Sequence, residues 1–370
     1  MNKNLLILSS STGGGHNMRA NALKDWWRDL GGDAIVSQPL ETTSNLYKFG
    51  SNFYNLIQRF YPALHFFYFH FLEIACIHRN KRTIIGTNSW VREIKEFNPR
   101  LVVSVHAHLN HGYLDLLRGE LPNLFNFAIY CGELADGRGF SRHWVNPNAD
   151  RFYGPFDETC NAAKIRNMPS DKTLTVGPLL RKAFYQKSCE SFKSKIFLKY
   201  GISHDIPIFL LGTGANGVNR HTDVLHSLKK HTGEFQVIAL CGRNLKTFLQ
   251  IQELKKNLKF NVIPLQTVGD EEMALFLREA KFLFARPGAG TTTEAIMCGT
   301  PMIFDVSRGV MPQEVNNLNF WHLHAPTVLT LNEPKSISKL LSNPIPNIKI
   351  ESSRSPKALL EDLELLCSNS

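Results

Sequence analysis

A short apolar segment that leads directly into a glycine-rich loop and then into an amphipathic segment occurs twice in the chain. The first copy consists of Leu5–Leu8 and the loop Ser9–Gly15, and the second consists of Ile208–Leu211 and the loop Gly212–Gly217. Strand, glycine turn and helix in that order are typical of the first unit of a parallel α/β sheet. Because the pattern restarts halfway along the chain, we expect an α/β fold with two Rossmann-like domains that face a cleft.

Further apolar segments of strand length alternate with stretches of helix length. They are Leu101–Val105, Phe125–Tyr130, Gln236–Leu240, Phe260–Pro264, Phe282–Ala285 and Met302–Val306. A chain of 370 residues can bury two separate cores, and the polar, lysine-rich stretch Arg181–Lys199 is a suitable boundary between them. We expect an N-terminal domain over 1–185, a C-terminal domain over 186–350, and an amphipathic helix within 351–370 that can pack on either domain.

The composition restricts the partner and the compartment. Lys and Arg outnumber Asp and Glu by 42 to 32, so the net charge of +10 indicates an anionic partner: phosphates, acidic lipid or nucleic acid. Seven scattered cysteines without a C-x-x-C pair favour a reducing cytoplasm. The run Leu5–Leu8 is too short for the core of a signal peptide, and no apolar run reaches the ~18 residues that a membrane span needs.

Residues 46–82 combine eleven Phe or Tyr with five Lys or Arg. Aromatic rings and cations together are typical of a membrane interface, where rings lie among headgroups and cations meet anionic lipid. A pair of aromatic helices buried against the first sheet is the alternative. An RNA-stacking surface has less support, because no nucleic-acid motif accompanies the segment. We therefore expect a cytoplasmic protein with peripheral contact to an anionic membrane, and no nucleic-acid partner.

The segment Arg286–Ala295 places small residues between the end of an expected strand and the start of a helix. Backbone N–H groups at such a helix start can bind a diphosphate, and Glu294, one turn further on, can accept hydrogen bonds from both hydroxyls of a ribose. The alternative is structural: Thr291 and Glu294 have the spacing of a capping box, and Gly299 with Pro301 is an ordinary helix stop.

Three further segments in the same half favour the nucleotide site. Gly212–Gly217 and Cys241–Asn244, which contains Arg243 and Asn244, each follow an expected strand, and the carboxyl ends of parallel strands meet at one edge of a sheet. Gln313, Glu314 and Asn317 lie downstream and carry groups that suit the hydroxyls of a sugar.

These motifs, taken in order, resemble the monogalactosyldiacylglycerol synthases and the processive diacylglycerol glucosyltransferases, and more distantly the peptidoglycan N-acetylglucosaminyltransferase MurG. In the first half the matching residues are Thr12–His16, Phe53–Asn55, Tyr61 with Pro62, Ser104–His106, His143 with Trp144, and Val176–Pro178. In the second half they are the glycine loops, Cys241–Asn244, Arg286–Glu294, Gly299 with Pro301, and Gln313, Glu314 and Asn317.

The resemblance implies a GT-B fold and an inverting, metal-independent hexosyltransferase without a cofactor. A hexose or N-acetylhexosamine would pass from a UDP-sugar on the C-terminal domain to a lipid such as diacylglycerol on the N-terminal domain. It also implies roles for the donor-side residues. Glu294 would hold the ribose, Val262 the uracil through its backbone, Gln313 and Asn317 the sugar, and Gly214 with the loop Pro287, Gly288, Ala289, Gly290 and Thr291 the diphosphate.

Inverting transfer needs a base for the proton of the acceptor hydroxyl. His16 directly follows the first glycine loop, whose Gly14 and Gly15 would line the acceptor side, and imidazole has a suitable pKa range. His16 is our first candidate for the base, or for a residue that positions the acceptor; the alternative is a helix cap. His106 and Glu133 are reserves. Relatives often have Thr-Asp where this chain has Gly132 and Glu133.

The run His106-Ala107-His108-Leu109-Asn110-His111 looks like the H-x-H-x-D-H zinc motif of metallo-β-lactamase-type hydrolases. Asn110 replaces the aspartate of that motif, and the strand–helix alternation does not fit an antiparallel sandwich. We expect these histidines to line the cleft. Two other functions stay open: a non-hydrolysing UDP-sugar epimerase, and a non-catalytic nucleotide-sugar sensor. A glycosyltransferase with a non-lipid acceptor is a third alternative.

Overall fold

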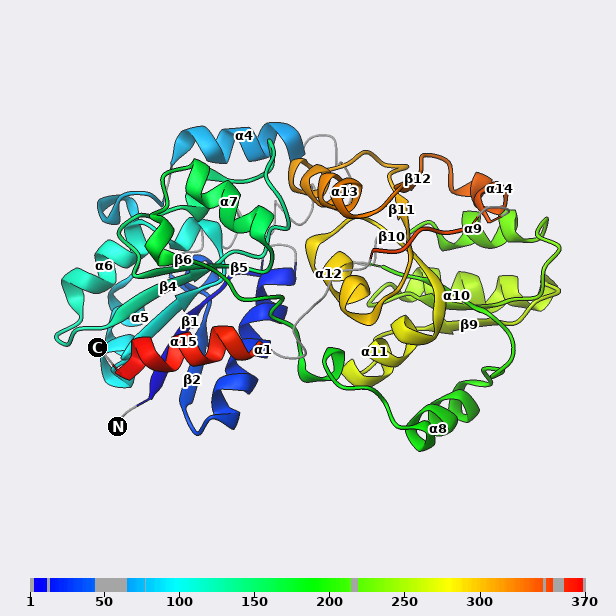
Figure 1. Cartoon of the computed structure of the whole chain (residues 1–370), viewed down its shortest axis with the longest axis horizontal. Helices are drawn as coiled ribbons and strands as arrows, with labels where there is room; N and C mark the ends of the chain where they lie inside the picture. Colours follow the sequence, from blue (N-terminus) through cyan, green and yellow to red (C-terminus); the bar gives the residue numbers. More distant parts are fainter. Residues whose placement is uncertain are drawn as a thin grey trace. The chain divides into compact units, whose positions relative to one another are not determined.

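The computed structural model describes residues 3–11, 14–43, 65–76, 78–213, 219–341, 344–348 and 356–368. The chain forms two compact units (Figure 1). The first contains residues 1–182, 311–316 and 352–370, and the second contains residues 183–310 and 317–351.

The first unit contains a six-stranded parallel sheet with the order β2-β1-β3-β4-β5-β6. Leu5 of β1 pairs with Ala34 of β2 on one side and with Leu101 of β3 on the other. The sheet therefore changes direction between β1 and β3, which is where α/β proteins bind their ligands. The strands are β1 (Asn4–Leu8), β2 (Asp33–Ser37), β3 (Leu101–Ser104), β4 (Asn126–Tyr130), β5 (Arg151–Gly154) and β6 (Thr173–Thr175).

Helices cover both faces of this sheet (Figure 1). The alternation along β1 separates the two cores: Leu6 and Leu8 pack with α5 and α6, and Leu5 and Ile7 pack with α1 and α15. The helices are α1 (Gly15–Asp29), α2 (Pro39–Thr42), α4 (His65–Ala75), α5 (Asn88–Phe97), α6 (Gly112–Glu120), α7 (Asp157–Ile165) and α15 (Lys357–Ser368), with the 3₁₀ turns η2 (Lys81–Thr83), η3 (Ala107–Leu109), η4 (Arg142–Trp144) and η5 (Ser170–Lys172).

The C-terminal helix α15 packs on the first unit, although its sequence fits either unit. Leu359 and Leu363 are fully buried in the same core as α1. The Asp362 carboxylate accepts hydrogen bonds from Tyr153 Oη at 2.6 Å and from Arg151 Nε at 3.2 Å. The first unit is thus built from both ends of the chain.

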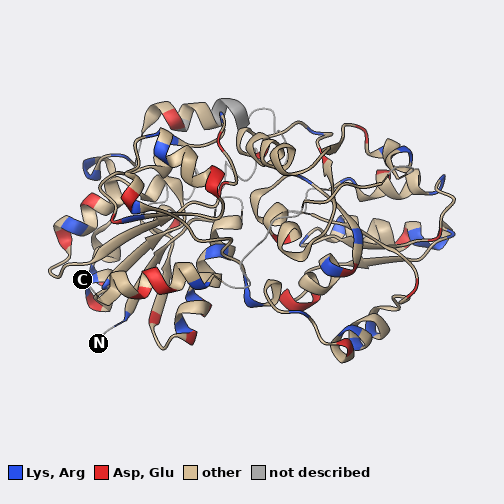
Figure 2. Cartoon of the chain, in the orientation of Figure 1, with Lys and Arg blue, Asp and Glu red and all other residues tan. Residues whose placement is uncertain are grey.

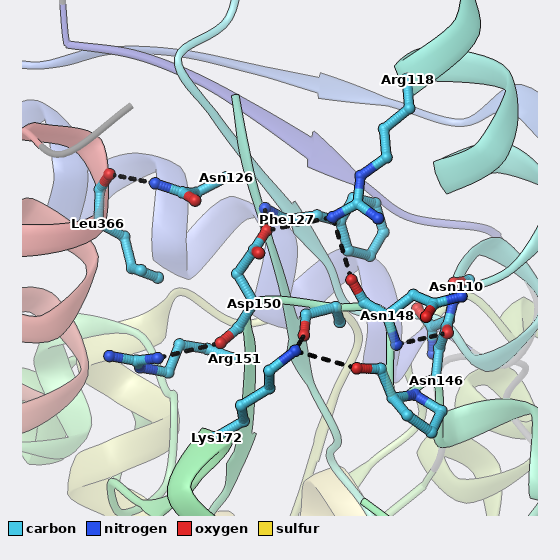
Figure 3. A network of polar contacts seen from close by, with 12 residues as sticks. Asn110, Arg118, Asn126, Phe127, Asn146, Asn148, Asp150, Arg151, Lys172 and Leu366 are labelled. Carbon is cyan, nitrogen blue, oxygen red and sulfur yellow. Dashed lines mark hydrogen bonds and ion pairs between the residues drawn. The ribbon is translucent and has the colours of Figure 1, made fainter. Parts of the chain in front are cut away.

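A polar network fixes the loop that precedes β5 (Figure 3). Asp150 Oδ2 accepts the backbone N–H of Phe127 at 2.7 Å, and Lys172 Nζ donates to two carbonyl oxygens of the loop, those of Pro147 and Ala149. Asn146 Nδ2 donates to the carbonyl oxygen of Asn110 at 2.5 Å. This last bond ties the loop to the histidine-rich segment that follows β3.

The second unit contains a six-stranded parallel sheet with the order β12-β11-β10-β7-β8-β9. Counted from β7, this is the strand order of the dinucleotide-binding fold, and its direction changes between β7 and β10. The strands are β7 (Ile208–Leu211), β8 (Gln236–Leu240), β9 (Val262–Leu265), β10 (Ala280–Ala285), β11 (Met302–Asp305) and β12 (Leu329–Leu331). The helices are α8 (Glu190–Tyr200), α9 (His221–Leu228), α10 (Leu245–Leu254), α11 (Asp270–Glu279), α12 (Ala289–Cys298) and α14 (Ile337–Leu340), with the 3₁₀ turns η6 (Lys182–Phe184), η7 (Lys255–Asn257) and η8 (Pro334–Ser336). Helix α13 (Pro312–His324) is divided, with residues 312–316 in the first unit and the rest in the second.

Charge distribution and helix length both bear on function. Lys and Arg are spread over the helices of both units among Asp and Glu in this view (Figure 2). In the described part of the chain, no helix combines the length and the apolarity needed to cross a bilayer.

Candidate active site

Three of the residues selected from the sequence lie at the carboxyl ends of adjacent strands of the first sheet. His16 is in the first turn of α1, which follows β1, His106 follows β3, and Glu133 follows β4. The sheet order places β1, β3 and β4 side by side. The rings of His16 and His106 are in edge contact, with centroids 4.5 Å apart, and the Trp144 ring lies 6.0 Å from His16.

The His16 ring is fixed by one short hydrogen bond. Nδ1 lies 2.7 Å from the carbonyl oxygen of Val105, which only accepts, so Nδ1 carries the proton and Nε2 has a free lone pair in the neutral ring. Burial, followed by the charge of Arg19, lowers the pKa of His16 to about 4. The imidazole is therefore neutral at pH 7 and can accept a proton at Nε2.

Glu133 has the opposite shift. Burial raises the pKa of its carboxyl to about 7, although the nearby Arg19 and a hydrogen bond with Trp144 both lower it. A carboxyl with this pKa is about half ionised at neutral pH and can act as an acid or as a base. Trp144 thus contacts both His16 and Glu133.

Arg19 is a member of the site that the sequence motifs did not indicate. It is buried, and its Nη2 donates to the carbonyl oxygen of Gly132 at 2.9 Å. A Cβ atom on Gly132 would come within 2.1 Å of Arg19 Cζ, so a larger residue there would displace the guanidinium. Because Gly132 has no side chain, the guanidinium of Arg19 can lie against the backbone that precedes Glu133. The sequence feature that could have identified Arg19 is its position three residues after His16, within the same expected helix.

The remaining predicted residues of the first glycine loop lie at the start of α1. Gly14 is the N-cap of α1 and has φ 75°, a left-handed conformation that favours glycine, and Gly15 is the first helical residue. Thr12 and Gly13 lie outside the described residues.

Asn110 explains why the zinc-like run lacks an aspartate. Its Nδ2 donates to the carbonyl oxygens of His143 at 3.1 Å and Trp144 at 3.3 Å, and a carboxylate cannot donate in this way. Asn110 therefore holds the segment that carries Trp144.

The fold of the unit is a parallel sheet and not an antiparallel sandwich, so the metallo-β-lactamase-type alternative has no support from the architecture.

In the second unit, the loop after β10 lies at the position where the sheet changes direction. Gly288 is the N-cap of α12, and Ala289, Gly290 and Thr291 form the first turn. The first amides of a helix have no intrahelical acceptor, so this end can bind an anion. The capping-box alternative is wrong, because the helix begins at Ala289 and Thr291 and Glu294 both lie inside it. The predicted stop is confirmed: Gly299 ends the helix with φ 70°.

Two side-chain contacts hold this loop in place. Asn317 is buried, and its Nδ2 donates to the carbonyl oxygen of Pro287 at 2.7 Å. Arg286 Nη2 donates to the carbonyl oxygen of Gly309 at 3.0 Å. Glu294 is only 4% exposed, one turn into α12. Its carboxylate thus lies about one turn from the amides that begin α12.

The structure brings together only part of the predicted donor set. Asn244 is the N-cap of α10, where its Oδ1 accepts the N–H of Thr247 at 3.1 Å, and Arg243 precedes it with an exposed side chain. Val262 is the first residue of β9 and thus lies at the amino end of the strand, away from the edge where the glycine loops end. The carboxyl end of β9 is Leu265.

The last two predicted donor residues, Gly214 and Gln313, stay untested. Gly214 lies outside the described residues. Gln313 is in the first turn of α13, within the stretch 311–316 that is grouped with the first unit.

Two parallel-sheet units of this kind form the GT-B fold, and a solved structure agrees. MurG of Acinetobacter baumannii aligns over 100% of this chain and 95% of its own, with a TM-score of 0.54 and 14% identity. At this level of identity the likeness establishes the fold.

The sequence comparisons agree with the resemblance that the motifs indicate. Residues 209–362 match the glycosyltransferase family 28 C-terminal domain. A probable monogalactosyldiacylglycerol synthase 2 of Oryza sativa is 24% identical over 86% of this chain and 68% of its own length. A processive diacylglycerol beta-glucosyltransferase of Bacillus pumilus is 24% identical over 92% of this chain and 86% of its own. The resemblance expected from the motifs is confirmed, and residues 209–362 carry the match to the glycosyltransferase family 28 C-terminal domain.

Proposed function

We propose that the protein transfers a hexose or N-acetylhexosamine from a UDP-sugar to a lipid acceptor such as diacylglycerol, with inversion and without a metal ion. The observation that carries this proposal is the start of α12, which lies where the second sheet changes direction between β7 and β10. Glu294 is buried one turn further along this helix. A helix start suits a diphosphate, and a carboxylate beside it suits the two hydroxyls of a ribose. The acceptor class comes from the printed names of the relatives.

In the proposed reaction the acceptor oxygen attacks the anomeric carbon from the face opposite the leaving group. The bond between that carbon and the diphosphate oxygen breaks, and its electron pair stays on the diphosphate. The amides at the start of α12 stabilise the new charge. The proton of the acceptor hydroxyl passes to His16 Nε2. Glu133 and Arg19 flank this base and supply an acceptor and a donor for the polar end of the lipid.

Membrane contact would bring a lipid acceptor to the first unit. On α4, Phe71 and Ile74 are 58% and 79% exposed, and Glu73 faces inward, where it accepts the backbone N–H of Arg142 at 3.2 Å. Next to this helix lies an open depression of about 750 Å³, lined by Cys76, Arg79, Asn80, Lys81, Asp115, Arg118 and Gly119. Exposed apolar side chains beside cations are the features that bind an anionic membrane surface. Residues 46–64 of the aromatic segment lie outside the described residues.

The direct test is to incubate the protein with several UDP-sugars and a lipid extract. We expect release of UDP that depends on the lipid, together with a glycosylated lipid of defined anomeric configuration. Conversion of the UDP-sugar to its epimer without any lipid product would instead establish the epimerase. UDP binding without turnover on any acceptor would establish the non-catalytic sensor.

Glu294→Gln should weaken UDP binding about 10- to 100-fold, because it removes the charge from a hydrogen-bonding group. Isothermal titration of UDP measures the change. Glu271→Gln is the matched control, because Glu271 is an exposed residue of α11 in the same unit. Unchanged UDP affinity in Glu294→Gln would show that UDP does not bind at α12.

Replacing Phe71 and Ile74 together by Asp should lower binding to anionic vesicles at least about tenfold, because two large apolar side chains lose their burial in the lipid. Co-sedimentation with vesicles that contain phosphatidylglycerol measures the effect. Leu198→Asp is the control, because Leu198 on α8 is 86% exposed in the other unit. Equal sedimentation of the double variant and the wild type would show that α4 does not bind the membrane.

A further inference from the structure

The histidine-rich run after β3 is part of a larger group of rings, of which the proposed reaction uses only His16. We call it the imidazole cluster, and its members are His16, His78, His106, His108, His111 and His143. Successive ring centroids are 4.5 Å apart from His16 to His106, 5.6 Å from His106 to His108 and 4.8 Å from His108 to His143. His78 lies 6.1 Å from His108, and His111 lies 6.2 Å from His143. The cluster is thus a continuous chain of rings.

This chain leads from the candidate base to the surface. Two members, His106 and His143, are buried at 5% and 2% exposure, whereas His16, His108, His78 and His111 are partly exposed. Asp115 follows His111 by one turn, its backbone N–H donating to the His111 carbonyl oxygen at 3.0 Å. Asp115 also lines the open depression beside α4. A carboxylate in contact with solvent therefore lies at the outer end of the cluster.

We propose that the imidazole cluster is a proton relay, which carries the proton of the acceptor hydroxyl from His16 through His106 and His108 to His78 and His111 at the surface. This inference rests on the proposed function. Each neutral imidazole has one N–H donor and one bare nitrogen, so a ring can take a proton on one side and release another on the opposite side. The ring separations allow direct or water-bridged hydrogen bonds between neighbouring nitrogens.

The reaction needs such a path. His16 uses Nδ1 to donate to Val105, so the proton arrives and must leave at Nε2, on the side where the substrates bind. An imidazolium there is unstable, because the ring is buried and Arg19 carries the same charge nearby. A bound lipid keeps water away from this position, and the adjacent His106 is then the nearest acceptor. Among the other charged groups around the cluster, Glu133 lies beside Arg19, and Arg79 lies beside His111 at the outer end.

A metal site and ordinary core packing account less well for the imidazole cluster. Among the described residues, no group of three His, Cys, Asp or Glu is arranged to hold a metal ion. Core packing needs apolar groups and would not need six rings that each require a hydrogen-bond partner.

His108→Phe tests the relay, because it keeps the ring volume and removes both nitrogens. We expect kcat to fall about tenfold or more in dilute buffer, with UDP affinity unchanged, and to recover when imidazole buffer is added, because a small base then removes the proton. His143→Gln should behave in the same way and serves if His108→Phe does not fold. His226→Gln, at an exposed site on α9, is the control and should keep wild-type kcat.

A loss of kcat that imidazole does not restore, or no loss at all, would overturn the relay while leaving the transferase activity of the wild type intact. Absence of transfer in the wild type would instead overturn the proposed function. A readout without substrates is ¹⁵N NMR of the histidine side chains. Rings that pass protons exchange their two tautomers, so the shifts of His108 should lie between those of a protonated and a bare nitrogen. Fixed tautomers in all six rings would contradict the relay.

Discussion

His16→Gln should lower kcat about 10²- to 10⁴-fold, which is the usual contribution of a positioned general base. Glutamine keeps a polar group near Val105 but cannot accept the acceptor proton at neutral pH. UDP affinity should stay unchanged, because His16 belongs to the first unit and the predicted diphosphate site belongs to the second. UDP release in the presence of lipid gives kcat, and titration calorimetry gives the affinity. His204→Gln, at an exposed position, is the matched control and should leave both quantities unchanged.

The pH profile separates the two candidate bases. The pKa of His16 is lowered to about 4, so His16 is already neutral throughout pH 6–8, and kcat/KM should be flat over that range if His16 is the base. The pKa of Glu133 is raised to about 7, so a base at Glu133 would make kcat/KM rise with pH around that value. A rise near pH 7 that disappears in Glu133→Gln would transfer the role from His16 to Glu133.

Much of the architecture follows from patterns in the sequence. The strands at Ile208–Leu211 and Gln236–Leu240 have the predicted bounds. The four strands that were not predicted are β2, β5, β6 and β12, which are three to five residues long and carry polar or exposed positions. Short strands of this kind are held by their neighbours in the sheet and carry little apolar pattern of their own.

The candidate site was harder to predict than the fold, for a physical reason. The three strand-end residues His16, His106 and Glu133 could be selected because parallel strands end at one edge. The partners that set their properties come from elsewhere: Arg19 reaches Gly132, more than a hundred residues away, and His78 reaches His108. Nothing local in the sequence specifies such contacts. Nor does it show that Val262 begins its strand rather than ending it.

Acidification from pH 7.5 to pH 5 should strongly destabilise the protein. Burial, as the largest cause, lowers the pKa of His16, His78, His111 and His221 to about 4, from about 6.5 in the unfolded chain, and it also lowers those of His106 and His108 well below 6.5. Below pH 6.5 the unfolded chain takes up these protons and the folded protein does not. Stability is therefore full above pH 6.5 and falls progressively towards pH 4.

The size of this effect is large compared with the stability of a domain. For His221, which is 1% exposed, a shift of this size corresponds to about 3 kcal/mol. Within the imidazole cluster part of each shift is repulsion between neighbouring rings, so the contributions do not simply add. Glu133 acts in the opposite direction: its raised pKa means that the folded protein binds a proton between pH 7 and pH 4.5 that the unfolded chain does not. One carboxyl cannot offset several histidines, and domains are stable by only about 5–15 kcal/mol.

The two units should also differ in how strongly their stability depends on pH, because the imidazole cluster lies in the first unit and His221 in the second. Urea unfolding at pH 7.5, 6.0 and 5.0, followed by hydrogen exchange of each unit, measures the change. We expect the first unit to lose protection at the higher pH. His221→Gln should reduce the pH dependence of the second unit alone, and His226→Gln, at an exposed site on the same helix, should leave it unchanged. Equal unfolding free energies at pH 7.5 and pH 5.0 would show that the cluster is hydrated, and a hydrated cluster could release the proton from His16 without a relay.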